Sequence, residues 1–328
     1  MERLDQFLEH KGLVFGIAYR MTGSFTDAED IVQETYLKWS RTKEQLIRSP
    51  KAFLSTIATR LSLDAIRKAK RKKETYIGPW LPEPIPTNHD EEIDPDTLDL
   101  AFLHLLEKLN PVERAVFLLR ESFNLDYGII SKSVNKKEDA CRQILKRAKE
   151  NLRSEKKKFK PDPELKKVLI HKFLLASSQG DPELLLPLLR DDIIVWTDGG
   201  GKIHAARIPI TGKPRVAAFL IRTRKHKHYK NVEYFLIKCN GTDCIIAYQK
   251  DKPITLRSFE IGENEISKIH TVMNPEKLGA FTDKQKLIEN GKLVPLGLFL
   301  LFPKKDFFGK QIPLWTKPLV NVIKWMFT

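Results

Sequence analysis

The chain has 328 residues, which is enough for two or three domains that each bury a core. Its hydrophobic content of 41% and charged content of 30% are ordinary for a globular protein. The net charge of +15 indicates a polyanionic partner, either nucleic acid or an acidic membrane surface. Three cysteines without paired or zinc-type spacing favour a reducing compartment and argue against a disulfide scaffold.

The chain carries no sign of export or of a membrane span. Its first residues, "MERLDQFLEHKG", are charged and amphipathic, unlike a signal peptide. The apolar run "LVPLGLFLLF" is shorter than the ~18–20 residues of a spanning helix and contains a proline. We therefore expect a cytoplasmic protein.

Residues 1–73 predict helices. The stretch "SFTDAEDIVQETYLKWS" begins with capping residues and places Ala28, Ile31, Val32, Thr35 and Trp39 on one buried face. The next helix begins at "SPKAF", where Ser49 is the N-cap and Pro50 stands in the first turn. A basic run ends this helix, and its arginines lie on a face other than the apolar one.

Residues 98–153 predict a helix-turn-helix. Asn110, Pro111 and Glu113 form a capping-box pattern, and a short "NKK" break separates two later helices. On the second of these helices Cys141 faces inward, so we interpret it as a packed core residue. The outward face carries basic and amide side chains in the half that enters a DNA major groove.

The rest of the chain differs in composition and in hydrophobic pattern. A Pro-rich and acidic linker occupies residues 74–97, and a charged linker occupies residues 154–163. Two helical stretches then precede β-type runs, which include "IIVWTD", "KIHAARIPI", "VEYFLIKC", "CIIAYQK", "ITLRSFEI" and "ISKIHTVM". The Asn240–Gly241 pair predicts a hairpin turn. This order favours an α+β domain with an antiparallel sheet.

The helical half resembles an extracytoplasmic-function (ECF) sigma factor, the smallest kind of bacterial sigma subunit. The resemblance rests on "DAEDIVQETYLKW", "SPKAFLSTIATRLSLDAIRKAKRKK" and "LNPVERAVFLLRESFNLDYGIISKSVNKKEDACRQILKRAKENL", in this order. It implies a polymerase- and minus-ten-binding domain at 1–73 and a minus-thirty-five-binding domain at 98–153. It further implies a protein that binds core RNA polymerase and promoter DNA, without enzymatic activity or a cofactor.

The remainder resembles the C-terminal part of one ECF subgroup, which carries a SnoaL-like domain of the nuclear-transport-factor-2-like (NTF2-like) fold, a cone-shaped antiparallel sheet with helices. Three short motifs match those of this subgroup, namely "YIGPWLPEP", "TDGGGK" and "NPEKL". The resemblance implies a domain at 164–278 that regulates the sigma factor in cis, without a dedicated anti-sigma protein. Whether its pocket binds a small-molecule ligand stays open.

The expected binding residues fall into two groups. Asp30, Gln33 and Glu34 share one helix face, where acidic and amide groups can meet basic groups of core polymerase. The expected DNA-binding residues can neutralise phosphates or read base edges, with Arg142, Gln143 and Lys146 as the base readers. The other members of this second group are Arg60, Arg67, Lys68, Lys70, Arg71, Lys136, Lys137 and Lys149.

The Pro-rich stretch 76–86 predicts a docking segment rather than a plain linker. Its prolines prevent a helix, so Trp80 and Leu81 become anchors on an extended segment. We expect them to contact the C-terminal domain near the Gly199–Gly201 loop or at 274–278. The predicted interdomain residues are Trp80, Leu81, Pro82, Asp198, Gly199, Gly200, Gly201, Lys202, Asn274, Pro275 and Leu278.

Two other functions remain open at this point. One is a ligand-responsive helix-turn-helix regulator, which would bind duplex DNA without polymerase. The other is a SnoaL-like enzyme with a DNA-binding appendage, although Asp198, His204 and His270 form no convincing catalytic set. The apolar, basic tail 279–328 has no clear period. We interpret it as packed on its parent domain in preference to membrane contact.

Overall fold

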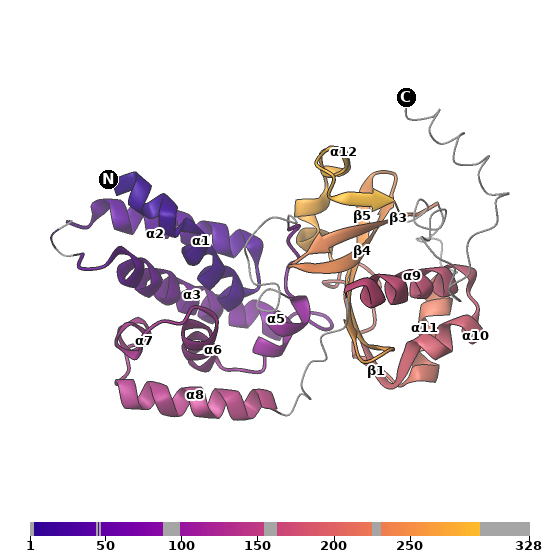
Figure 1. Ribbon diagram of the computed structural model, residues 1–328, viewed down its shortest axis with the longest axis horizontal. Helices are drawn as coiled ribbons and strands as arrows, with labels where there is room; N and C mark the ends of the chain where they lie inside the picture. The colour runs from indigo at the N-terminus through magenta and orange to yellow at the C-terminus, as the bar shows by residue number, and fades with distance from the viewer. Residues whose placement is uncertain are drawn as a thin grey trace.

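The computed structural model describes residues 3–87 apart from 44 and 46, and residues 99–153, 163–224 and 231–295. A helical half and a sheet-containing half lie side by side, and the chain crosses between them more than once (Figure 1). None of the helices in these ranges is long and apolar enough to cross a membrane.

The first helical segment consists of α1 (Arg3–Thr22), α2 (Phe25–Arg41) and α3 (Pro50–Glu74). The predicted caps are present: the Ser24 hydroxyl accepts from the Asp27 amide, and the Ser49 hydroxyl accepts from the Ala52 amide. The predicted apolar face of α2 is buried, because its members recur at helical spacing and pack on α1 and α3.

The second helical segment consists of α5 (Leu100–Leu106), α6 (Pro111–Phe117), a π-helical turn (Leu118–Ser122), α7 (Tyr127–Val134) and α8 (Glu138–Arg153). Asn110 and Glu113 form the predicted capping box. Asn135 ends α7 with a left-handed φ of 52°, which produces the tight turn before α8. The predicted helix-turn-helix is therefore confirmed, and Cys141 is buried in its core.

The two helical segments share one core rather than forming two separate ones. The Arg114 guanidinium donates to the carbonyl of Met21 over 2.7 Å, and the Ser133 hydroxyl lies 3.2 Å from that of Thr56. The Arg20 guanidinium lies 4.6 Å from the centre of the Phe123 ring. In this arrangement the two sigma-like segments cannot move apart without exposing apolar surface.

The sheet-containing half is an α+β domain, as predicted. It has α9 (Pro163–Gln179), α10 (Pro182–Leu185), a 3-10 turn (Leu186–Leu188) and α11 (Lys213–Arg224). Its sheet runs in the order β2-β1-β6-β5-β4-β3-β7, with bounds β1 Leu189–Asp198, β2 Ile210–Thr211, β3 Glu233–Cys239, β4 Thr242–Gln249, β5 Lys252–Ile261, β6 Ile266–Val272 and β7 Leu293–Pro295.

Two sequence expectations for this sheet need correction. The sheet is mostly antiparallel, as predicted, but it is mixed because β1 pairs with β6 in parallel. In the run "KIHAARIPI" only Ile210 lies in a strand, because a tight glycine turn at 199–201 sends the chain away from the sheet.

The sheet has an apolar core on each face. Helices α9 and α11 cover one face. On the other face, Leu81 and Leu100 from outside the domain complete the core.

The C-terminal domain continues past the predicted boundary at Leu278. Two 3-10 turns (Pro275–Lys277 and Gly279–Phe281), α12 (Lys284–Glu289) and β7 follow, and Phe281, Leu287 and Leu293 are buried on the second face of the sheet. Residues 296–328, the greater part of the predicted tail, lie outside the described residues.

Candidate functional site

A segment that we call the strap, residues 76–87, runs between the helical half and the C-terminal domain. Its four prolines exclude a helix and leave backbone groups available for contacts with both halves. Leu81 and Ile85 are buried, and each belongs to a different core: Leu81 packs on the sheet and Ile85 on the helical half. The strap is therefore an interdomain element and not a free linker.

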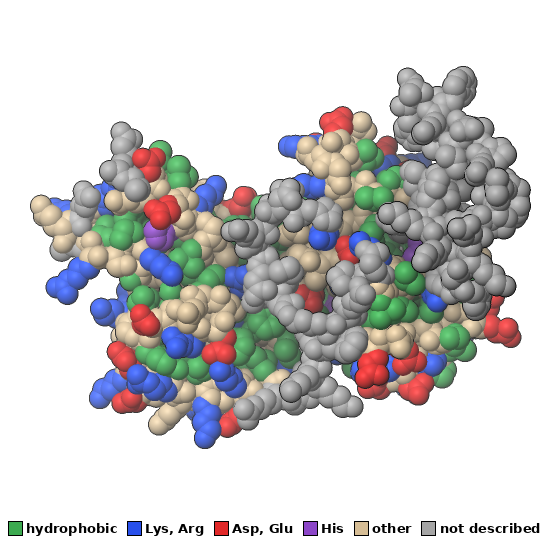
Figure 2. Space-filling view, in the orientation of Figure 1, with side chains coloured by type: hydrophobic (Ala, Val, Ile, Leu, Met, Phe, Trp, Pro, Cys, Tyr) green, Lys and Arg blue, Asp and Glu red, His purple; other side chains and the backbone are tan. Residues whose placement is uncertain are grey.

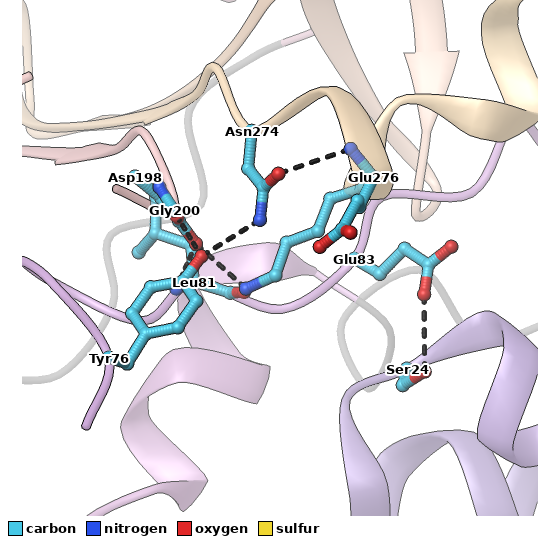
Figure 3. Close-up of polar contacts among 9 residues, drawn as sticks. Ser24, Tyr76, Leu81, Glu83, Asp198, Gly200, Asn274 and Glu276 are labelled. Atoms are coloured by element: carbon cyan, nitrogen blue, oxygen red, sulfur yellow. Dashed lines mark hydrogen bonds and ion pairs between the residues drawn. The ribbon is translucent and has the colours of Figure 1, made fainter. Parts of the chain in front are cut away.

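Asp198 is the centre of the contact between the strap and the domain (Figure 3). It ends β1 and is fully buried. Its carboxylate accepts from the Leu81 amide over 2.9 Å, from the Lys277 ammonium over 2.7 Å and from the Gly200 amide over 3.1 Å. The Tyr76 hydroxyl donates to it as well.

Lys277 is the buried counter-ion of Asp198. Its ammonium also donates to the Leu81 carbonyl over 2.5 Å and lies 3.5 Å from the centre of the Trp80 ring. A buried ion pair is stable only when further hydrogen bonds satisfy its polar groups. Here the strap provides those hydrogen bonds, so the pair and the strap depend on each other.

Asn274 and the glycine loop complete this arrangement. We call it the Asp198 latch: the contact of Asp198, Lys277, Asn274 and the 199–201 loop with Tyr76, Trp80 and Leu81 of the strap. The Asn274 amide donates to the Tyr76 hydroxyl over 3.0 Å. Gly200 has a φ of 63°, and a Cβ on it would lie 2.4 Å from the Asn274 side-chain nitrogen. Burial and the neighbouring Asp198 raise the pKa of Tyr76, so its hydroxyl remains a donor.

The middle of the strap contacts α2 through Glu83. The Glu83 carboxylate accepts from the Phe25 amide over 2.9 Å and from the Ser24 hydroxyl over 3.2 Å (Figure 3). A carboxylate at this position satisfies unpaired amides at the start of a helix and complements its dipole. Burial raises the pKa of Glu83, although these hydrogen bonds act in the opposite direction.

Helix α5 provides another contact between the halves. Leu100 packs in the same core as Leu81. The His104 ring lies 5.4 Å from the rings of both Trp196 and His270, and those two rings stack at 4.9 Å. His270 is thus a packed residue of this interface.

The expected polymerase-binding face is accessible. Asp30, Gln33 and Glu34 are exposed on α2, next to an exposed apolar residue, Leu37. Glu34 also pairs with Lys38 one turn further along the helix, at 3.3 Å. The structure therefore places all three predicted residues on one free surface of the helical half.

The expected DNA-binding residues lie on α3 and on the helix-turn-helix. Arg60 donates to the Lys132 carbonyl of α7 over 2.7 Å, so the contact between the helical segments occupies it. Arg142 pairs with Asp139 at 2.8 Å, and Lys149 pairs with Glu121 at 2.7 Å. The side chain of Arg71 lies outside the described residues. The remaining predicted members are exposed, namely Arg67, Lys68, Lys70, Lys136, Lys137, Gln143 and Lys146.

Figure 2 shows basic side chains of the helical half interspersed with acidic ones on the face in view. Pairs such as Arg67 with Asp64, 2.9 Å apart, are local to one helix and exposed. Such pairs are weak and can be exchanged for phosphate contacts.

The structure brings together most of the predicted interdomain residues. Pro82 packs beside Gly23 of the helical half, while Gly199, Gly201 and Pro275 shape the loops of the latch, and Leu278 is buried beneath it. Lys202 instead pairs with Glu276 at the surface of the C-terminal domain.

Sequence reasoning missed Tyr76, Lys277 and Glu83. The signal for Lys277 was its place within "NPEKL", beside the residues that were predicted.

Comparison with known proteins agrees with this architecture. The Sigma-70 region 2 family matches residues 7–72, and the Sigma-70, region 4 family matches residues 99–152. The chain is 32% identical to the ECF RNA polymerase sigma factor SigJ of Mycobacterium tuberculosis over 216 residues, which cover 63% of this chain and 69% of SigJ. This chain belongs to the ECF RNA polymerase sigma factors.

Other relatives extend the likeness to the C-terminal domain of this ECF sigma factor. The probable ECF sigma factor SigI of M. tuberculosis is 28% identical over 82% of this chain and 92% of its own length. The crystal structure of M. tuberculosis SigJ matches with a TM-score of 0.68 and 25% identity, over 85% of this chain and 99% of SigJ. The α+β domain is therefore part of a SigJ-like arrangement, and the chain is a sigma factor rather than an enzyme.

Proposed function

We propose that this sigma factor binds core RNA polymerase, recognises and melts a bipartite promoter, and is regulated in cis by its C-terminal domain. The acidic α2 face of Asp30, Gln33 and Glu34 would meet basic groups of polymerase. The exposed basic and amide side chains of α3 and α8 would contact promoter DNA. In this proposal the Asp198 latch does the work of a separate anti-sigma protein.

We infer that promoter binding requires a change from the arrangement described. Regions 2 and 4 must reach two DNA elements that are separated along a helix rising 3.4 Å per base pair. Here the two regions share one core, and Arg60 of region 2 donates to the backbone of region 4. We infer that the structure is the closed state and that opening precedes promoter binding.

The observation that carries the regulatory proposal is the burial of Asp198. The strap satisfies its carboxylate, and the same strap contacts region 2 through Glu83. A single segment therefore connects the state of the C-terminal domain with that of the helical half. Loosening the latch should favour the open, promoter-binding state.

Run-off transcription with purified core polymerase tests this proposal, on a promoter selected from random DNA by the holoenzyme. We expect Asp198→Asn to raise the yield of transcript, because it removes the buried charge that the strap satisfies. Asp191→Asn, on the same strand but with an almost fully exposed side chain, should behave like wild type. An unchanged or lower yield from Asp198→Asn would contradict regulation by this latch.

The proposed polymerase surface has its own test. Reversing the charge of Asp30 and Glu34 to lysine should weaken the pull-down of core polymerase. Glu9→Lys, an exposed change on α1, serves as the control. Equal binding by all variants would remove this face from the proposal.

The proposed DNA contacts differ in kind, so they can be separated experimentally. Arg142→Ala should change promoter preference, since arginine can read guanine bidentately. Lys149→Ala should weaken binding more uniformly, because a phosphate contact carries no sequence information. Equal effects of Arg142→Ala on matched and scrambled DNA would contradict its role as a base reader.

A further inference from the structure

The turn between β3 and β4 is buried, which is unusual for a hairpin turn. Turns normally lie at the surface, where water satisfies their backbone groups. Asn240, at the tip of this turn, is fully buried and has a left-handed φ of 53°. The groups that cover it come from outside its domain.

The second half of the strap covers one side of the turn. The Asn240 amide donates to the Ile85 carbonyl, and the Ile85 amide donates to the Asn240 side-chain oxygen, both over 3.0 Å. The Thr87 amide donates to the Lys238 carbonyl over 3.0 Å, and the Gly241 amide donates to the Thr87 hydroxyl over 3.1 Å. This half of the strap thus adds to the hairpin as a short extended segment.

The other side of the turn contacts region 2 directly. The Asn240 side-chain amide donates to the Tyr19 hydroxyl over 2.6 Å, and that hydroxyl donates to the Glu83 carbonyl over 2.6 Å. Tyr19 belongs to α1 and is fully buried. The Glu83 amide donates to the Gly23 carbonyl over 2.8 Å. The Asn240 side-chain amide and the Tyr19 hydroxyl therefore join the hairpin, the strap and α1.

We propose that the Asn240 turn is a second latch, a binding site in the C-terminal domain for the end of α1, and that it holds region 2 independently of the Asp198 latch. The two latches use different parts of the domain: the β3–β4 turn in one case, and the ends of β1 and β6 in the other. They also differ in chemistry, since the Asn240 latch consists of neutral hydrogen bonds.

Tyr19 has the properties that such a latch needs. Burial raises the pKa of its hydroxyl, which therefore remains a donor to the Glu83 carbonyl while it accepts from Asn240. Without the hydroxyl, a buried amide and a buried carbonyl lose their partner. Leaving such groups unsatisfied shifts a closed-to-open equilibrium by about 10-fold or more.

Hydrogen exchange on the full-length free protein separates the two latches, because each has its own reporter amide. The Leu81 amide donates to Asp198, and the Glu83 amide donates to Gly23 beside the Asn240 latch. The second latch deepens the proposed regulation in cis. Its test needs neither polymerase nor promoter, so its outcome is independent of the transcription result for Asp198→Asn.

We expect Tyr19→Phe to speed exchange of the Glu83 amide by about 10-fold or more and to leave the Leu81 amide within about 3-fold of wild type. Asn240→Gly, which tolerates the left-handed backbone but lacks the amide, should do the same. The control is Tyr248→Phe, since that hydroxyl donates to Phe281 inside the C-terminal domain. Tyr248→Phe should leave the exchange rate of the Glu83 amide unchanged.

Two results would overturn the second latch. If Tyr19→Phe accelerates both amides equally, the strap opens as one unit and the latches are not independent. If neither Tyr19→Phe nor Asn240→Gly changes the Glu83 amide, the turn does not hold region 2.

Discussion

The two halves of the strap meet the C-terminal domain in different ways. Around Leu81 it satisfies an ion pair, Asp198 with Lys277, that belongs wholly to the C-terminal domain. Around Ile85 it shares neutral hydrogen bonds that bridge two domains, from Asn240 to Tyr19. On opening, both members of the ion pair would stay together in the C-terminal domain, whereas the Asn240 side chain would lose Tyr19 as its acceptor. In our proposal the charged latch therefore recognises the strap, and the neutral latch fixes region 2.

The largest effect is expected from removing one partner of the buried ion pair. Lys277→Met leaves Asp198 buried without its counter-ion, which costs about 3–5 kcal/mol. The opening free energy measured by exchange of the Leu81 amide should fall by about this amount. The Glu83 amide, next to the neutral latch, should change much less.

A surface lysine near the same loop provides the matched control. Lys202 pairs with Glu276, and both side chains are at least half exposed. An exposed pair contributes about 1 kcal/mol or less, so Lys202→Met should hardly change the Leu81 amide. Similar effects of the two lysine variants would show that burial of the charge is unimportant.

The glycine loop allows a steric test of the Asp198 latch. In Gly200→Ala the new Cβ would meet the Asn274 side chain at 2.4 Å, so Asn274 must move and its hydrogen bond to Tyr76 breaks. We expect the opening free energy measured by exchange of the Leu81 amide to fall by about 2–3 kcal/mol. Gly212→Ala also requires a positive φ, of 89°, but has no atom within 4 Å of the new Cβ, so it serves as a control for alanine at a positive φ without a steric clash.

Trp80 tests the aromatic contribution to the charged latch. The Lys277 ammonium above its ring should contribute about 1–2 kcal/mol in a partly buried site. Trp80→Leu should therefore weaken protection of the Leu81 amide by this amount. Trp80→Phe, which keeps a weaker aromatic face, should retain part of it. An equal loss in both variants would indicate packing rather than a cation–π contact.

The smallest effect concerns the pH dependence of Glu83. Its pKa in the closed state is raised above the ordinary value of 4.5, so closing takes up protons. This contribution is fully present below the ordinary pKa and is lost as the pH rises through the raised one. Exchange of the Phe25 amide, corrected for its intrinsic pH dependence, should reveal it. Glu83→Gln cannot titrate and should flatten the profile; a persistent slope would assign it to another group.

Local features were predictable from the sequence because their causes are local. The buried face of α2 follows from helical spacing, and the capping box at Asn110 follows from side chains three residues apart. The α+β class follows from the succession of helical and β-type runs. The contact of Trp80 and Leu81 near the Gly199–Gly201 loop or at 274–278 was predicted from the prolines that keep the segment extended and from the motifs of the resemblance, and not from periodicity.

The remaining features depend on contacts between distant segments. Asn240 is separated from Tyr19 by 221 residues along the chain, and Asn-Gly predicts a turn without indicating what covers it. Tyr19 fits the apolar pattern of α1, so its hydroxyl carried no separate signal. Parallel pairing of β1 with β6 likewise joins strands that are far apart in sequence.

The central claim, that the free protein is closed and opens to bind the promoter, is tested most directly by a distance measurement. Spin labels at Lys11→Cys on α1 and Arg147→Cys on α8 would report the separation of regions 2 and 4 by pulsed EPR. Both positions are exposed, whereas Cys141, Cys239 and Cys244 are buried. We expect one short distance in the free protein, and a longer one with core polymerase and promoter DNA. The same short distance in both states would contradict the claim.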